Sequence, residues 1–139
     1  MDSLDRFLKA QMRDYNVALS EIKSGHKRSH WIWYIFPQVK GLGFSSTSEY
    51  YGIDGLDEAK KYMQNDTLKN RLIEISEALL GLDSSDASDV MGYPDDLKLR
   101  SSMTLFAEAA PEIEVFQKVL DKFFDGKKDE MTLKIIGVK

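Results

Sequence analysis

The chain has 139 residues, of which 42% are hydrophobic and 30% charged, a balance typical of one globular domain. Its formal net charge of −4 argues against broad binding to nucleic acids or membrane surfaces, which requires a basic field. The absence of cysteine excludes disulfides, zinc–thiolate sites, iron–sulfur clusters and cysteine nucleophiles.

The ends and the apolar runs of the chain give no sign of secretion or membrane insertion. Residues 1–5 are acidic and lack the apolar region of a signal peptide. The longest apolar run, residues 31–36, is too short to span a bilayer. We therefore expect a cytoplasmic protein with no membrane or nucleic-acid partner, in which residues 1–139 form a single helical domain. One basic patch remains, and we interpret it as a solvated helix end: Lys23, His26, Lys27 and Arg28.

The first predicted helix runs to about Lys23, and Ser3 is placed to cap it. Gly25 supplies the left-handed conformation that ends a helix. Gln11 interrupts the apolar face, so its amide either bonds to a neighbouring loop or serves as a donor in a pocket. The apolar residues recur at three- and four-residue steps: Leu4, Phe7, Leu8, Met12, Tyr15, Ala18, Leu19 and Ile22.

Residues 26–43 hold both histidines and both tryptophans, and we expect them to anchor the core. Ser29 is a candidate cap for a short helix over 30–35, since Pro37 disfavours helical geometry at Phe36. A strand is the alternative, because aromatic and β-branched residues are frequent there. We prefer the helix because no other segment of comparable strand character exists to pair with it.

On such a helix the two tryptophans point about 200° apart, so both cannot be central to the core. We therefore predict that one of Trp31 and Trp33 is deeply buried and that the other lines a cleft with His30 and Gln38. The sequence does not decide which tryptophan takes which place.

The rest of the chain alternates helical segments with short polar loops. Pro94 is well placed at the first position of one helix. We predict an all-α fold of about six to eight helices, with no sheet beyond a minor strand pair. The later segments are a short turn carrying Tyr50 and Tyr51, helices over 56–64 and 67–80, a short helix ending at Gly92, a helix over 94–109, one beginning at Pro111, and a last turn capped by Asp129.

Metal and dinucleotide motifs are incomplete. His26 and His30 have the spacing that aligns two ligands on a helix, but the residues around them look like helix boundaries and no carboxylate lies at motif spacing. Gly41-Leu42-Gly43 begins like a dinucleotide fingerprint, yet Ser46 stands where the third glycine belongs and no βαβ pattern surrounds it. We therefore expect no metal and no cofactor.

The helix over 94–109 has an unusual composition, because polar residues crowd its middle: Arg100, Ser101, Ser102 and Thr104. Serine and threonine compete with helical hydrogen bonding and are poor choices there without a compensating partner. Lys98 and Ser102 share a face with Asp95, and Ser101 lies beside them. Small hydroxyls next to a cation suit a phosphate or carboxylate. The alternative is that small residues allow close helix contact beside a surface lysine.

Two segments carry a resemblance to a known family. Residues 29–38 with Gly41-Leu42-Gly43, and Lys98 with residues 101–106, resemble the two signatures of domain of unknown function 1810. The resemblance implies a single, mainly α-helical domain and supplies no established reaction. Some members carry the name calpastatin, but calpain inhibitors are disordered and this composition is that of a packed protein. Further matching positions are Gln11, Tyr15, Ser45, Ser48, Asp129, Thr132 and Leu133.

A second similarity is short. Residues 47–51 resemble a motif of helical N-glycosidases that act on riboflavin intermediates and ADP-ribose-like compounds. This similarity is the source of an enzyme hypothesis, in which His30 or Glu49 acts as general acid or base.

The leading functional hypothesis is a pocket for a small anionic ligand, nucleotide- or phosphate-like, between residues 30–43 and the helix over 95–106. One alternative is an N-glycoside-type hydrolase acting on a nucleotide-like substrate. Another is a non-catalytic protein-interaction module, and both a monomer and a homodimer remain open. The candidate ligand-binding residues are Trp33, Gln38, Lys40, Gly41, Gly43, Lys98, Ser101 and Ser102.

Overall fold

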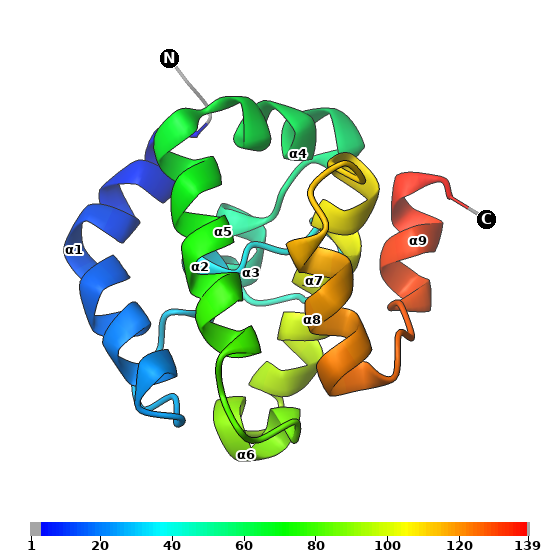
Figure 1. The fold of residues 1–139 in the computed structure, drawn as a ribbon. Coiled ribbons are helices and arrows are strands. Elements are labelled where there is room, and N and C mark those ends of the chain that lie inside the picture. The colour runs from blue at the N-terminus through cyan, green and yellow to red at the C-terminus, as the bar shows by residue number, and fades with distance from the viewer. Residues whose placement is uncertain (1–3, 139) are drawn as a thin grey trace.

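The computed structural model describes residues 4–138, so Ser3, the expected cap of the first helix, lies outside the described residues. The all-α prediction is confirmed (Figure 1). Between residues 4 and 138, β pairing is limited to an isolated parallel bridge between Val39 and Ile53. The same stretch contains nine helices: α1 (Asp5–Lys23), α2 (Ile32–Ile35), α3 (Ser46–Tyr51), α4 (Gly55–Gln64), α5 (Asp66–Leu80), α6 (Ala87–Met91), α7 (Asp95–Ala109), α8 (Val115–Phe124) and α9 (Glu130–Ile136).

Helix α7 lies at the centre of the packing and contacts α2, α4, α6, α8 and α9. Helices α1 and α9 flank the bundle on opposite sides, and α4 crosses one end (Figure 1). Because α7 is surrounded, every residue from Ser101 to Ala107 is buried. This helix therefore has no single apolar stripe, and its hydroxyl residues Ser101, Ser102 and Thr104 are buried with the apolar ones. None of the helices within 4–138 is both long and apolar enough to cross a membrane.

Aromatic side chains link the helices across the core. The ring of Phe7 on α1 meets Tyr62 on α4 edge-on, with 5.3 Å between centroids. Tyr62 in turn lies 5.1 Å from Phe106 on α7, which lies 6.0 Å from Phe116 on α8. All four side chains are fully buried. Aromatic pairs at such distances add to the stability that burial of their surface provides.

The expectation that α8 begins at Pro111 is wrong, because the helix begins at Val115. Ala110, before the proline, has φ −139° and ψ 66°, outside the helical region. A proline disfavours helical geometry in the residue before it. The Ile113 N–H then donates to Ala110 O at 3.0 Å, forming a turn before the helix starts.

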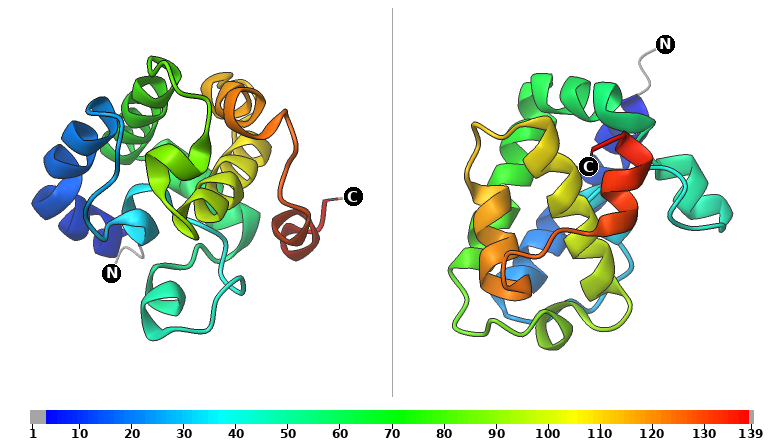
Figure 2. Two further views of the ribbon diagram at one scale, coloured as in Figure 1. Left: turned by 90° about the horizontal axis from the view of Figure 1, so that it is seen from below. Right: turned by 90° about the vertical axis from the view of Figure 1, so that its right-hand side faces the viewer.

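One segment, residues 40–52, projects from the helical body and carries α3; we call it the arm (Figure 2, right). Its base is closed by two backbone hydrogen bonds, from Lys40 N–H to Ile53 O at 2.8 Å and from Ile53 N–H to Gln38 O at 2.9 Å. Gly52 is required there, since a Cβ on it would lie 2.8 Å from Lys40 Cα. The arm is thus fixed at its base, directly beside α2.

Candidate functional site

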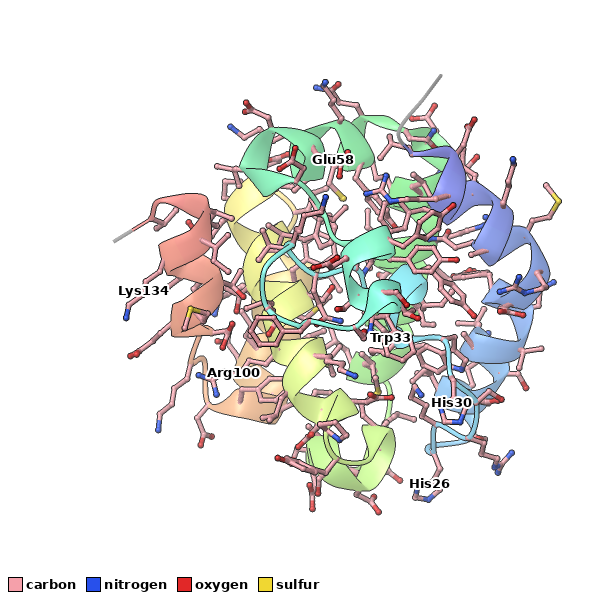
Figure 3. The ribbon with its side chains drawn as sticks, turned by 180° about the vertical axis from the view of Figure 1, so that it is seen from behind. His26, His30, Trp33, Glu58, Arg100 and Lys134 are labelled. Atoms are coloured by element: carbon pink, nitrogen blue, oxygen red, sulfur yellow. The ribbon has the colours of Figure 1, made fainter. Side chains whose placement is uncertain are left out.

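A cleft of about 320 Å³ lies between the arm, the first half of α7 and the start of α9. Figure 3 looks onto this face, with Trp33 beside the arm. The volume falls at the lower end of the range for small-molecule sites. Apolar and polar side chains both line the cleft: Trp33, Gln38, Leu42, Gly43, Ser48, Pro94, Leu97, Lys98, Ser101, Asp129 and Met131.

Lys98 and Trp33 form the charged corner of this cleft. The Lys98 ammonium lies 4.6 Å from the centroid of the Trp33 ring, in a cation–π arrangement. Asp95 Oδ1 is 3.4 Å from that ammonium, while Asp95 Oδ2 is only 2.7 Å from Lys27 Nζ. Two ammonium groups therefore share one carboxylate, and the one at the cleft is the more distant partner.

Gln38 lines the cleft from the base of the arm. Its backbone carbonyl accepts from Ile53 N–H, which fixes the position of the residue. Its side-chain Nε2 is buried and has no hydrogen-bond partner. Buried polar atoms in proteins are nearly always paired, so this amide is available to a partner that enters the cleft.

The hydroxyls of α7 hold the start of α9. Ser101 Oγ lies 3.2 Å from Asp129 Oδ2, and Thr104 Oγ1 accepts from Asp129 N–H at 2.9 Å. One residue earlier, Arg100 Nη2 donates to Lys128 O at 2.9 Å. The cost of polar residues inside this helix is thus offset by docking of the 128–129 segment.

Asp129 also caps α9, as expected from the sequence. Its Oδ2 accepts from Thr132 N–H at 3.0 Å and from Thr132 Oγ1 at 2.5 Å, in addition to the contact with Ser101. Asp129 therefore lines the cleft, and its Oδ2 already takes part in hydrogen bonds within the protein.

The structure brings five of the eight candidate ligand-binding residues to the cleft: Trp33, Gln38, Gly43, Lys98 and Ser101. Ser102 is fully buried and its Oγ has no hydrogen-bond partner. Lys40 and Gly41 are exposed and do not line the cleft. A Cβ on Gly41 would lie 3.5 Å from Ile135 Cδ1, so this glycine faces α9 instead.

The two candidate catalytic residues lie elsewhere. His30, on the loop before α2, and Glu49, on α3, are both exposed, and neither lines the cleft. Among residues 4–138, no group of three or more His, Cys, Asp or Glu side chains is arranged to hold a metal ion.

Six lining residues were not among the candidates, and they come from three separate segments: Leu42, Ser48, Pro94, Leu97, Asp129 and Met131. Leu97 could have been predicted from the sequence, because it precedes Ser101 by four residues and so lies on the same face of the helix. Leu97, in the first turn of α7, is 48% exposed. Met131 could not be placed without knowing where α9 docks.

On the other side of α2, the polar groups around Trp31 all have partners within the protein: the indole N–H, the Glu21 carboxylate and the Lys27 ammonium. Trp31 is 1% exposed, and its indole N–H donates to Glu21 Oε1 at 3.0 Å. Glu21 also accepts from Arg28 N–H at 2.7 Å and from Ser29 N–H at 2.9 Å, with Ser29 Oγ at 2.5 Å. Burial raises the pKa of Glu21, but these hydrogen bonds outweigh it and lower the pKa to about 2.

Lys27 also belongs to this region. It was expected to lie with Lys23, His26 and Arg28 in a solvated basic patch at a helix end, and for Lys27 this expectation is wrong. The Lys27 side chain is 5% exposed, its ammonium lies 4.8 Å from the Trp31 ring centroid, and it pairs with Asp95. Sequence reasoning also missed Glu21. A signal was present, because Glu21 follows Ala18 by three residues on the apolar face of α1.

The chain belongs to the family described as "Protein of unknown function (DUF1810)", whose model matches residues 1–136. Its fold is similar to the crystal structure of the conserved hypothetical protein Rv1873 from Mycobacterium tuberculosis. The two sequences are 40% identical, the match covers 98% of this chain and 97% of the other, and the TM-score is 0.94. No curated protein matches the chain.

Proposed function

We propose that this DUF1810 member binds a small planar ligand carrying an anionic group, of the nucleotide class, in the cleft between the arm and α7. The ring of the ligand lies along the apolar wall formed by Trp33 and Leu42, and the anionic group meets the ammonium of Lys98. The proposal is for a binding function and assigns no reaction.

The observation that carries the proposal is the position of the Lys98 ammonium. It stands at the cleft over an aromatic ring, 3.4 Å from a carboxylate that is held more closely by Lys27. An ammonium with a loosely held partner can exchange that partner for an anionic ligand at little cost. The side chain is 29% exposed, so a ligand can reach it.

The cleft is not uniformly positive, because Asp129 lines it and Lys40 does not. The Asp129 oxygen is engaged with Ser101 and Thr132, which stabilises its charge within the protein. This arrangement favours a ligand with a single anionic group next to Lys98 over a polyanion, which would approach Asp129 as well.

The cleft does not favour the hydrolase alternative, since neither His30 nor Glu49 lines it. A general acid or base must come within hydrogen-bond reach of the reacting group, directly or through one water. No other observation in the described part of the chain favours a reaction over binding.

The test is the affinity of the four ribonucleoside monophosphates for the wild type, for Lys98→Ala and for a control, Lys118→Ala. Lys118 lies on α8 with a side chain that is 61% exposed and a distant partner, Glu114 at 3.9 Å. We expect at least one monophosphate to bind the wild type and the control equally, and to bind Lys98→Ala at least tenfold more weakly.

Without ligand, the melting temperatures of the three proteins should agree closely, because a partly exposed lysine contributes little to folding. The proposal fails if none of the four monophosphates binds, or if Lys98→Ala binds them as tightly as the control does.

A further inference from the structure

A small recess of about 20 Å³ opens from the cleft beneath the arm. It shares five lining residues with the cleft: Trp33, Gln38, Leu42, Gly43 and Ser48. Val39, Tyr51 and Gly52 close its far side. A space of this size admits a group of about one water molecule, such as a single carbonyl or amide group at the end of a ring.

Two glycines, Gly43 and Gly52, line the recess, and neither has room for a side chain. A Cβ on Gly43 would lie 2.9 Å from Ser48 Oγ and 3.1 Å from Ser48 Cβ, so a side chain there would push against Ser48, which also lines the recess. Gly52 is equally constrained on the opposite side by the backbone of Lys40. The arm is therefore held close to the cleft while a small opening is kept between them.

The polar groups of the recess are a donor and an acceptor. Gln38 Nε2 is buried without a partner, and leaving such a group unpaired is costly. Ser48 Oγ donates to Ser45 O at 2.9 Å, which leaves its oxygen able to accept. A group that satisfies both must itself offer an acceptor and a donor side by side.

We propose that the recess takes the C=O of a lactam in a planar ring, that the adjacent N–H stays at its mouth beside Ser48, and that Gln38 recognises the C=O. Gln38 Nε2 would donate to the C=O of this edge and Ser48 Oγ would accept from its N–H, so the two hydrogen bonds come from two residues. The inference rests on the proposed function, since the same ligand places its anionic group at Lys98. It narrows the ligand class to rings that carry a lactam, such as uracil or guanine.

The experiment compares two probes, uridine 5′-monophosphate and its N3-methyl analogue, which keeps the phosphate and blocks the amide edge. Each is titrated into the wild type and into Gln38→Leu by calorimetry. We expect methylation to weaken binding to the wild type at least tenfold and to change binding to Gln38→Leu less than twofold. Such non-additivity is the signature of a direct contact between the two changed groups.

A second variant, Gly43→Ala, narrows the recess without removing the amide. It should reduce the affinity for uridine 5′-monophosphate while leaving the analogue, which is already excluded from the recess, unaffected. Circular dichroism establishes that each variant is folded before it is titrated.

The two proposals fail in different ways. If both probes bind the wild type equally, or if a monophosphate binds but neither the uridine nor the guanosine one does, the inference about the recess is overturned and the proposed function stands. If guanosine monophosphate alone of these two binds, it and its N1-methyl analogue replace the uridine probes in the same comparison. If none of the four monophosphates binds the wild type, both are overturned.

Discussion

Trp31 and Trp33 are two residues apart and lie in opposite environments. Trp31 is buried, its indole N–H is bonded to Glu21, and the lysine over its ring is paired at 2.7 Å. Trp33 is half-buried at a cleft, beside an unpaired amide and a lysine whose partner is 3.4 Å away.

Both tryptophans have a lysine ammonium over the ring, so the difference lies in whether the polar groups around each ring have hydrogen-bond or ion-pair partners within the protein. Groups that serve the fold are paired within the protein, because an unpaired buried group costs stability. Groups left with distant or missing partners are retained where a ligand can supply the partner. On this criterion the Trp31 side serves the fold, and the Trp33 side is the one at which we propose that a ligand binds.

The largest effect should come from the tryptophans themselves. Trp31→Ala should lower the free energy of unfolding by about 3–5 kcal/mol, because it removes a fully buried ring. Trp33→Ala should cost less than about 2 kcal/mol, since that ring is partly exposed already. Urea denaturation of the two variants measures both values, and equal losses would remove the basis of the comparison.

Glu21 should give the next largest effect, with a characteristic pH dependence. Its pKa is lowered from 4.5 to about 2, so its contribution to stability is present above pH 4.5 and is lost as the pH falls towards 2. At one pKa unit per 1.36 kcal/mol, that contribution is about 3 kcal/mol. Glu21→Gln should therefore be less stable at pH 7 and lose less stability on acidification.

The control for this variant is Glu77→Gln, at an exposed position of α5. It should follow the wild type at every pH. A parallel pH dependence of the wild type and Glu21→Gln, measured by urea denaturation from pH 7 to pH 2.5, would contradict the structural role of this carboxylate.

Alanine substitutions of two adjacent serines of α7 should change the free energy of unfolding by smaller amounts and in different directions. Ser101→Ala removes a contact with Asp129 and should cost about 1 kcal/mol, whereas Ser102→Ala removes a buried hydroxyl without a partner and should be neutral or stabilising. Thermal unfolding of the two variants measures the difference. A larger loss in Ser102→Ala would show that its hydroxyl has a partner.

Much of the fold could be predicted from the sequence because the helices carry regular apolar patterns and clear boundaries. Helix α5 ends at Leu80, before Gly81, as expected, and α9 is capped by Asp129. The predicted start of α8 at Pro111 was wrong because proline is favoured in the turn before a helix as well as in the first turn of the helix itself.

The site could be predicted only in part. Trp33, Gln38, Gly43 and Lys98 were identifiable because aromatic, amide, glycine and charged residues stand out from their surroundings. Ser102 could not be told from Ser101, because its burial depends on which helix packs against that face of α7. Asp129 and Met131 reach the cleft only through the docking of α9, which no local pattern records.

The most direct test of the difference between the two tryptophans is the ¹H–¹⁵N spectrum of their indole N–H groups during titration with the four ribonucleoside monophosphates. We expect at least one monophosphate to shift the Trp33 signal saturably, to leave the Trp31 signal in place, and to require at least tenfold more ligand for the same Trp33 shift in Lys98→Ala. The account is contradicted if no monophosphate shifts Trp33, if both signals move together, or if the Trp33 shift in Lys98→Ala saturates at the same ligand concentration as in the wild type.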